Sequence, residues 1–326
     1  MKRLGIVLLS ILLILAGCAP APEAAPETAR PGVSVRVAAL MGPTGMGMAP
    51  LMERAANAEL TDDLTFLITG APDDIVAKIV SGEVDIAAAP INLASALYQR
   101  TEGEVVMLAV NTLGVLYVLE AGDEIQAIGD LAGKTLYATG QASTPEYMLS
   151  HILTQNGLSE SVTVEYLAEH SELAALAAAG EVSLAMLPEP NVTATMLKNP
   201  DLRVALNLTE EWNKISDTEP VQGCIIARRA FVEENPEAVS DFLVQYADST
   251  AFVNESPKEA AALIEKHGIM ASAAAAEKAI PNCNIVCLTG TEMQAAASAM
   301  LQVLFEANPK SVGGAMPGDD LYHMGS

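Results

Sequence analysis

The chain has 326 residues, of which 51% are hydrophobic and 4% aromatic, and its formal net charge is -24. This length allows one large domain or two medium lobes, each with its own core. The negative charge opposes binding to phosphate backbones and to anionic lipid head groups, so we expect no nucleic-acid partner.

The N-terminus has the pattern of a secretory signal. Lys2 and Arg3 precede an apolar run of 13 residues, 4–16, shorter than the about 20 residues that a membrane-spanning helix needs. The run closes on Leu-Ala-Gly-Cys, which resembles the bacterial lipobox. We therefore expect a signal peptide at residues 1–17 and a lipid on Cys18, which cleavage would leave as the mature N-terminus. An ordinary secretory signal with a chance cysteine is the alternative.

Residues 18–32 are expected to form a flexible linker between this anchor and the folded body. After Cys18 they read APAPEAAPETARPG, without a large apolar side chain. Such a segment cannot bury enough surface to order itself, and its prolines favour an extended chain. The linker would give the body reach above the membrane.

From residue 35 the chain alternates short β-rich runs with helical patterns, which predicts an α/β fold with mainly parallel sheets. After Arg228 the strand patterns stop and four helices are expected, at 236–253, 257–267, 272–279 and 292–306. Proline at the first helical position supports two of these helix starts, at Pro236 and Pro257. The expected strands are 35–40, 64–69, 84–89, 105–110, 115–119, 135–138, 162–167, 182–187, 203–206 and 223–228.

An internal repeat organises these elements. Residues 64–90 align without a gap on residues 162–188, at a constant offset of 98, with seven identities. Both copies read strand, helix, Gly-Glu-Val turn, strand and Pro. Any two βα units share some of this pattern, but an ungapped match of this length favours a true structural repeat.

Two copies this far apart in sequence favour two similar lobes. Lobe I would hold residues 33–117 and 222–326, and lobe II would hold residues 118–221. The chain then crosses twice between the lobes, near Gly114–Leu119 and near Pro220–Gly223. Two extended crossovers make a hinge, and two lobes on a hinge make a cleft that can close.

The ligand is expected where the strands of open α/β sheets end and helices begin. Four such turns, at 41–47, 90–92, 139–145 and 188–191, lie two per lobe at comparable points of the repeat. Taken alone, each turn is an ordinary loop pattern. The candidate ligand-binding residues are Thr44, Gly45, Met46, Gly47, Pro90, Asn92, Thr112, Gly114, Gln141, Ser143, Thr144, Glu189, Asn191 and Gln222.

The four turns contain no Lys or Arg, so no guanidinium is available there to hold an acid group. Main-chain N–H groups and helix dipoles could still bind a small anion. Glu189 is the one charged side chain in the turns. It would either face the cleft and accept hydrogen bonds from an amine or ring N–H, or cap the helix that begins at Asn191.

The cysteines suggest one disulfide and no metal site. With Cys18 lipidated, Cys224, Cys283 and Cys287 remain, and one bridge can form. We expect a Cys224–Cys283 bridge with Cys287 buried and free; three free thiols are the alternative. The Cys-x₃-Cys spacing has no further Cys or His nearby to complete a zinc site.

The lipobox, the paired lobes, Gly42-Pro43-Thr44-Gly45 after the first strand and the Gly-Glu-Val units resemble the substrate-binding proteins of bacterial ABC importers. The pattern is closest to the group for nitrate, sulfonate, taurine and thiamine-precursor uptake. Residues 227–264, the Leu-Pro-Glu-Pro at 187–190 and the segment 307–314 are similar to that group, and the resemblance covers residues 33–315.

The resemblance implies a type II periplasmic-binding-protein fold whose lobes close over one small molecule. The closed form would dock on an ABC permease driven by a cytoplasmic ATPase, and the protein would be a monomer tethered to the outer face of the bacterial cytoplasmic membrane. No cofactor is implied. Without a basic residue in the turns, the ligand is expected to be a neutral or amine-bearing heterocycle, with a sulfonate or nitrate as alternatives.

Two other functions stay open on the same fold. A ligand-binding sensor for a membrane receptor has the same sequence pattern. An enzyme resembling the eukaryotic thiamine-pyrimidine synthase would need a lysine and a reactive histidine in the cleft. His151, His170, His267 and His323 lie in helix or loop contexts, with no Lys beside them in a cleft turn, so no enzyme is expected.

Overall fold

The computed structural model describes residues 31–325, and residues from Gly32 onward form one compact unit. The expected signal peptide, Cys18 and nearly all of the expected linker lie outside the described residues. Within the described part, every helix is too short or too polar to cross a bilayer.

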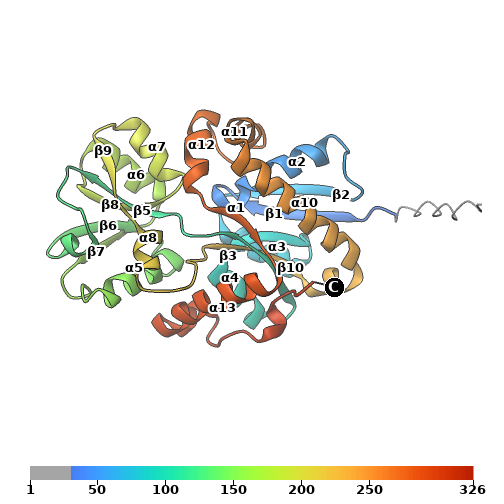
Figure 1. Cartoon of the computed structure of the whole chain (residues 1–326). Helices are drawn as coiled ribbons and strands as arrows, with labels where there is room; N and C mark the ends of the chain where they lie inside the picture. Colours follow the sequence, from blue (N-terminus) through green and yellow to red (C-terminus); the bar gives the residue numbers. More distant parts are fainter. Residues whose placement is uncertain (1–30, 326) are drawn as a thin grey trace, which may run out of the picture. The chain divides into compact units, whose positions relative to one another are not determined.

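The described chain forms two separate β-sheets flanked by helices (Figure 1). The first sheet has six strands in the order β11-β4-β10-β3-β1-β2, and the second has five in the order β7-β6-β8-β5-β9. The bounds are β1 Ser34–Leu40, β2 Asp63–Thr69, β3 Ile86–Pro90, β4 Val105–Thr112, β5 Leu116–Ala121, β6 Thr135–Thr139, β7 Thr163–Leu167, β8 Leu184–Pro188, β9 Leu202–Asn207, β10 Gly223–Arg228 and β11 Ile285–Leu288.

The helices pack on these sheets. Figure 1 places α5 to α8 with the second sheet and the other helices with the first sheet. Their bounds are α1 Pro43–Met46, α2 Ala49–Ala56, α3 Pro72–Ser81, α4 Ile91–Arg100, α5 Thr144–Gln155, α6 His170–Ala179, α7 Asn191–Lys198, α8 Leu208–Asn213, α9 Arg229–Glu234, α10 Pro236–Glu255, α11 Pro257–Lys266, α12 Ala273–Ala279 and α13 Gly290–Ala307, with four 3₁₀ turns, η1 Ile128–Leu131, η2 Ile280–Asn282, η3 Pro309–Val312 and η4 Asp319–Leu321.

The two sheets have the same topology. In the first sheet β1 pairs parallel with β2 and β3, and in the second β6 pairs parallel with β7 and β8. In each sheet the next strand, β10 or β5, is antiparallel to its neighbours. Both of these strands follow directly after the chain has passed from one sheet to the other. They enter from the edge where the parallel strands end, and so run in the opposite direction.

This inserted strand adds a detail to the expected sheets. Most strands of each sheet run in one direction, as expected, but the sheets are mixed, because the strand that enters from the other sheet reverses the direction at its position. The strand patterns could not reveal this, because a strand buried on both faces has the same composition in either orientation.

The sequence repeat corresponds to a structural repeat. Helices α3 and α6 are both 10 residues long and begin 98 residues apart, at Pro72 and His170. Each ends on a glycine in the left-handed conformation, Gly82 at φ 75° and Gly180 at φ 74°. Strands β3 and β8 then begin at the same offset, at Ile86 and Leu184.

Each sheet also contains a buried carboxylate paired with arginine. In the first sheet, Asp85 accepts hydrogen bonds from Arg36 and Arg228, which lie on β1 and β10. In the second sheet, Glu120 on β5 pairs with Arg203 on β9 at 2.5 Å. These pairs join strands that are distant in sequence.

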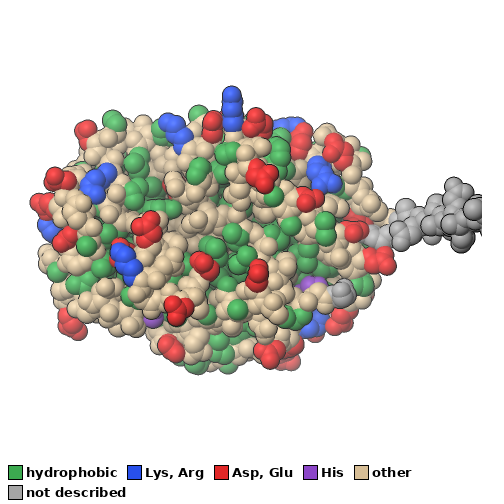
Figure 2. Space-filling view, viewed as in Figure 1, with side chains coloured by type: hydrophobic (Ala, Val, Ile, Leu, Met, Phe, Trp, Pro, Cys, Tyr) green, Lys and Arg blue, Asp and Glu red, His purple; other side chains and the backbone are tan. Residues whose placement is uncertain are grey.

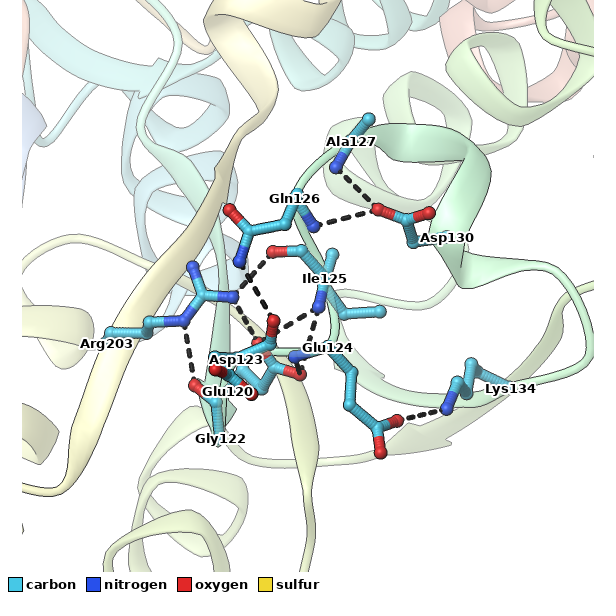
Figure 3. A network of polar contacts seen from close by, with 10 residues as sticks. All are labelled: Glu120, Gly122, Asp123, Glu124, Ile125, Gln126, Ala127, Asp130, Lys134 and Arg203. Atoms are coloured by element: carbon cyan, nitrogen blue, oxygen red, sulfur yellow. Dashed lines mark hydrogen bonds and ion pairs between the residues drawn. The ribbon is translucent and has the colours of Figure 1, made fainter.

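The Glu120 carboxylate also fixes the loop that follows β5 (Figure 3). Its oxygens accept from the main-chain N–H groups of Glu124 and Ile125, while Arg203 donates to the carbonyl of Ile125. Asp130 accepts from two further N–H groups of the same loop. The loop therefore has its polar groups satisfied without regular secondary structure.

Strand β11 was not expected. It pairs antiparallel with β4, with Ile285 opposite Thr112 and Leu288 opposite Val110. It has only four residues, and its register with β4 is irregular, so its alternation is too short to stand out in the sequence.

The expected disulfide is wrong. Cys224, Cys283 and Cys287 are all free thiols. Cys224 lies in the hydrophobic cluster on one face of the first sheet and Cys283 in the cluster on the other face. The sheet therefore separates the two sulfurs. Cys287 is free as expected, and only partly buried.

Candidate functional site

The edges at which the parallel strands end carry the expected turns of both sheets. Strands β1, β3 and β4 of the first sheet end there, next to the start of β10: Gly223 pairs with both Pro90 and Thr112. In the second sheet β8 ends next to the start of β5, with Pro188 opposite Leu116. Residues 113–115 connect β4 directly to β5, so these two edges adjoin.

On the first sheet the expected residues form one hydrogen-bonded group. The carbonyl of Thr44 accepts from the side-chain amide of Asn111 at 3.1 Å. The N–H of Gln222 donates to the carbonyl of Thr112, and the carbonyl of Gln222 accepts from the N–H of Ile91, next to Asn92. Gly223 lies against this group: a Cβ there would be 2.7 Å from both Thr44 Cγ2 and Asn111 Oδ1.

Two direct contacts join this group to the second sheet. The hydroxyl of Thr144 donates to Asn92 Oδ1 at 3.2 Å, and the side-chain amide of Gln222 lies 3.2 Å from the sulfur of Met148. Thr144 and Met148 both belong to α5. The start of α5 therefore lies against the first-sheet turns, as a clamp from two sides requires.

Several expected residues serve packing. Met46 is fully buried, and its sulfur contacts Cys283. A Cβ on Gly45 would lie 2.3 Å from the carbonyl oxygen of Leu40, so this glycine permits a close backbone approach. A Cβ on Gly47 would lie 2.8 Å from the hydroxyl oxygen of Tyr246. The glycines of this turn therefore serve the α1 packing.

Gly114 has a similar role in the first crossover. A Cβ there would lie 2.0 Å from Thr209 Oγ1 and 2.9 Å from Pro220 Cγ, which belongs to the returning segment. The two connections between the sheets therefore pass close to each other, and only glycine fits where they meet.

The turn between β6 and α5 is largely exposed. Gln141 is exposed, and Ser143 donates to the carbonyl of Gly140 within its own turn at 2.7 Å. A pocket of about 550 Å³ adjoins this turn, between the first part of α5 and the end of α13. Tyr147 and Asn308 are among the residues that line it, and the Asn308 amide donates to the Tyr147 hydroxyl at 3.0 Å.

Glu189 is 2% exposed, and its contacts correspond to the capping role, one of the two alternatives that the sequence left open. Its carboxylate accepts from the N–H of Thr193 at 3.1 Å and from the Thr193 hydroxyl at 2.9 Å, as a cap of α7 does. It also faces the first sheet, where the side-chain amide of Asn282 lies 3.5 Å from it. Burial raises the pKa of the Glu189 carboxyl above its ordinary value.

The remaining expected residues flank these contacts. Pro90 precedes α4, and Asn191 is the first residue of α7; both are half-buried. The peptide bond between Glu189 and Pro190 is cis.

Sequence reasoning missed the asparagines of the site and one histidine. Asn111 and Asn282 contact the expected residues Thr44 and Glu189, and Asn308 contacts Tyr147 on α5. All three lie outside the four turns. His170 was set aside as a helix residue. Its Nδ1 lies 2.6 Å from the hydroxyl of Thr139, at the end of β6 behind the exposed turn. In the sequence, these residues could have been found only as polar residues near the ends of strands or helices.

Comparison with known proteins identifies this architecture. Residues 48–279 match the family described as ABC transporter, phosphonate, periplasmic substrate-binding protein. The chain belongs to this family. A substrate-binding protein of this kind works outside the cytoplasm and delivers small molecules to the permease of an ABC importer. A search of curated proteins found no match.

Solved structures support the fold of this substrate-binding protein. An ABC transporter protein from Parabacteroides distasonis matches with a TM-score of 0.76 and 24% identity, over 89% of this chain and 98% of that one. The aliphatic sulphonate binding protein SsuA from Escherichia coli matches with a TM-score of 0.72 and 18% identity, over 90% and 92%. The nitrate-binding protein NrtA from Synechocystis PCC 6803 matches with a TM-score of 0.52 and 12% identity, over 72% and 66%.

The expected type II periplasmic-binding-protein fold is thereby confirmed, as is the role in import. The matched family and the similar structures are binding components of transport systems. Among residues 31–325, no group of three or more His, Cys, Asp or Glu side chains is placed to hold a metal ion.

Proposed function

We propose that this substrate-binding protein captures an amine-bearing small molecule between its two lobes and catalyses no reaction on it. Lobe I would consist of residues 33–117 and 222–326, and lobe II of residues 118–221. The contact of Thr144 with Asn92 supports this arrangement, since it brings a turn of each lobe together. The expected residues that do not serve packing are proposed to contact the ligand as well.

Glu189 is the observation that carries the ligand class. It is a buried carboxylate at the junction of the two lobes, and no Lys or Arg pairs with it in the contacts of the described residues. A buried charge is costly unless a partner compensates it. A ligand ammonium group would supply that partner, whereas a simple anion would be repelled.

The other end of the ligand is proposed to be acidic. The family is described by its phosphonate ligands. Helix α5 begins at the junction with Thr144, and a helix N-terminus favours negative charge. An aminophosphonate or aminosulfonate therefore fits both groups. A neutral heterocycle, or a sulfonate or nitrate without an amine, would be the outcome if Glu189 serves only to cap α7.

Matched ligand pairs test this proposal. We expect 2-aminoethylphosphonate to bind more tightly than ethylphosphonate, and taurine more tightly than ethanesulfonate, by about tenfold, because one charge-assisted hydrogen bond contributes about 1.5–3 kcal/mol. Calorimetry at pH 7 measures the affinities. A thermal-shift screen that adds nitrate, pyrimidines and simple amines covers the alternatives, because a ligand that binds the folded protein raises its unfolding temperature, and more so the further its concentration exceeds the dissociation constant.

The Glu189→Gln variant is the matched control. It keeps the side-chain shape and removes the charge, so the preference within each pair should disappear. In the unchanged protein the preference should also fade as the pH drops through the raised pKa of Glu189, because the protonated carboxyl no longer attracts an ammonium group. Equal affinities within both pairs at pH 7 would exclude the amine-bearing class.

We further propose that residues 1–17 are removed and that Cys18 carries a lipid, which would anchor a monomeric body to the outer face of the cytoplasmic membrane through residues 18–32. The Leu-Ala-Gly-Cys pattern after a short apolar run supports this. In cells, the Cys18→Ala variant should lose incorporation of labelled fatty acid and leave the membrane fraction. Unchanged labelling would contradict lipidation at this residue.

A further inference from the structure

The segment that links α12 to β11 reaches from the first sheet to the second. The hydroxyl of Tyr117, on β5, donates to the carbonyl of Asn282 at 3.0 Å. The side-chain amide of Asn282 lies 3.5 Å from the carboxylate of Glu189, which follows β8. Tyr117 and Glu189 are both buried. One residue of the C-terminal third therefore contacts two buried groups of the second sheet.

The same segment holds the first crossover. The carbonyl of Asn284 accepts from the N–H of Leu113 at 3.1 Å, and its side-chain amide donates to the carbonyl of Gly114. Asn284 has φ 43°, in the left-handed region that asparagine tolerates better than most residues. Asn284 therefore contacts the crossover, while Asn282 contacts the second sheet.

The segment is anchored firmly to the first sheet. Asn254, on α10, donates to the carbonyl of Ile285 at 2.9 Å, and Ile285 pairs with β4. Helix α12, just before the segment, packs against α7 of the second sheet, and Figure 1 shows the two helices side by side. The segment is thus fixed at one end and in contact with the opposite sheet at the other.

We propose that residues 282–284 form a latch that favours the closed arrangement of the lobes, and that Asn282 is a positioning residue for Glu189. The proposal rests on capture between two lobes. When the lobes separate, the Tyr117–Asn282 and Asn282–Glu189 contacts must break together. Closure therefore orients the Glu189 carboxylate, and loss of the Asn282 amide should favour opening.

Asn282→Ala tests this latch, because it removes the amide and keeps the carbonyl that Tyr117 contacts. Pulsed electron paramagnetic resonance can measure the separation of the two lobes. It would use spin labels on Lys198→Cys and Lys258→Cys in a Cys287→Ser background. Both lysines are exposed, one on each side of the junction. In Asn282→Ala we expect the ratio of molecules with a long label-to-label distance (open) to molecules with a short one (closed) to rise about tenfold.

Asn254→Ala is the matched control, since it removes an amide that bonds within the first-sheet body only. It should leave the distances unchanged. Tyr117→Phe removes the second contact and should shift them in the same direction as Asn282→Ala. The dissociation rate of 2-aminoethylphosphonate should rise about tenfold in Asn282→Ala and stay near the original value in Asn254→Ala.

If Asn282→Ala and Asn254→Ala gave the same spin-label distances and the same dissociation rate, the latch proposal would be overturned. The distance measurement needs no ligand, so it separates this proposal from the ligand class. A shifted distance distribution in a protein that binds none of the amine-bearing probes would keep the latch and reject the aminophosphonate.

Discussion

Two buried carboxylates show how the surroundings decide what the same chemical group does. Burial raises the pKa of the Glu189 carboxyl, and its hydrogen bonds from Thr193 and Asn282 do not offset this. Burial also raises the pKa of Asp85, but hydrogen bonds from Arg36 and Arg228 outweigh it and hold the pKa below the ordinary value. Asp85 is thus a structural link, and Glu189 is left with capacity for a further partner.

The Asp85→Asn variant should reduce the free energy of unfolding by about 2 kcal/mol, because it weakens the charge-assisted hydrogen bonds from Arg36 and Arg228 at a buried site. Urea unfolding near pH 7 measures this. Since the folded pKa is lowered, the contribution is present above the ordinary aspartate range and is lost as the pH falls through the folded value. The difference from the unchanged protein should therefore shrink in acid.

Glu83→Gln is the control for this substitution. Glu83 pairs with Lys78 on the surface, at 3.0 Å and with its own side chain 63% exposed. Such a pair is screened by water and contributes little. Equal losses for Asp85→Asn and Glu83→Gln would contradict the role assigned to burial.

At the scale of elements, the repeat was the most reliable sequence signal. It predicted strand, helix, turn and strand at a fixed offset, and α3 and α6 keep this offset and share their left-handed glycine ends. The helix starts at Pro236 and Pro257 were also predictable, since proline restricts the backbone locally. Strand β11 was not, because its pairing with β4 depends on residues about 175 positions earlier in the chain.

Gly82→Ala and Gly180→Ala should each lower the free energy of unfolding by about 1 kcal/mol, because alanine is strained at positive φ. No atom lies within 4 Å of a Cβ at either position, so the cost is one of backbone conformation alone. Chemical denaturation measures both variants.

Gly129→Ala serves as the comparison. A Cβ there is equally unobstructed, but the residue does not have a positive φ. It should leave stability unchanged or raise it slightly, because alanine restricts the unfolded chain. A loss at Gly129 as large as at Gly180 would show that the left-handed ends are not the cause.

At the scale of the whole molecule, the face shown in Figure 2 carries scattered acidic side chains with basic ones between them. The two sheets share a topology, and the chain passes between them at residues 113–115 and again between α8 and β10. Segments from all parts of the chain meet at the junction: α4, α5, the end of β8 and the turn before β11. The proposed ligand site therefore combines contributions that no single sequence window contains.

The sequence by itself determined the strands and helices with strong local patterns, the repeat, and the turns between strands and helices, because hydrophobic periodicity, glycine and proline act within a few residues. Only the tertiary structure decided that β5 and β10 are antiparallel, that Cys224 and Cys283 lie on opposite faces of a sheet, and that Asn282 contacts Glu189. These features depend on strand order and on packing between distant segments. The local composition of a segment does not determine which face of a sheet it packs on after the chain has passed from one sheet to the other.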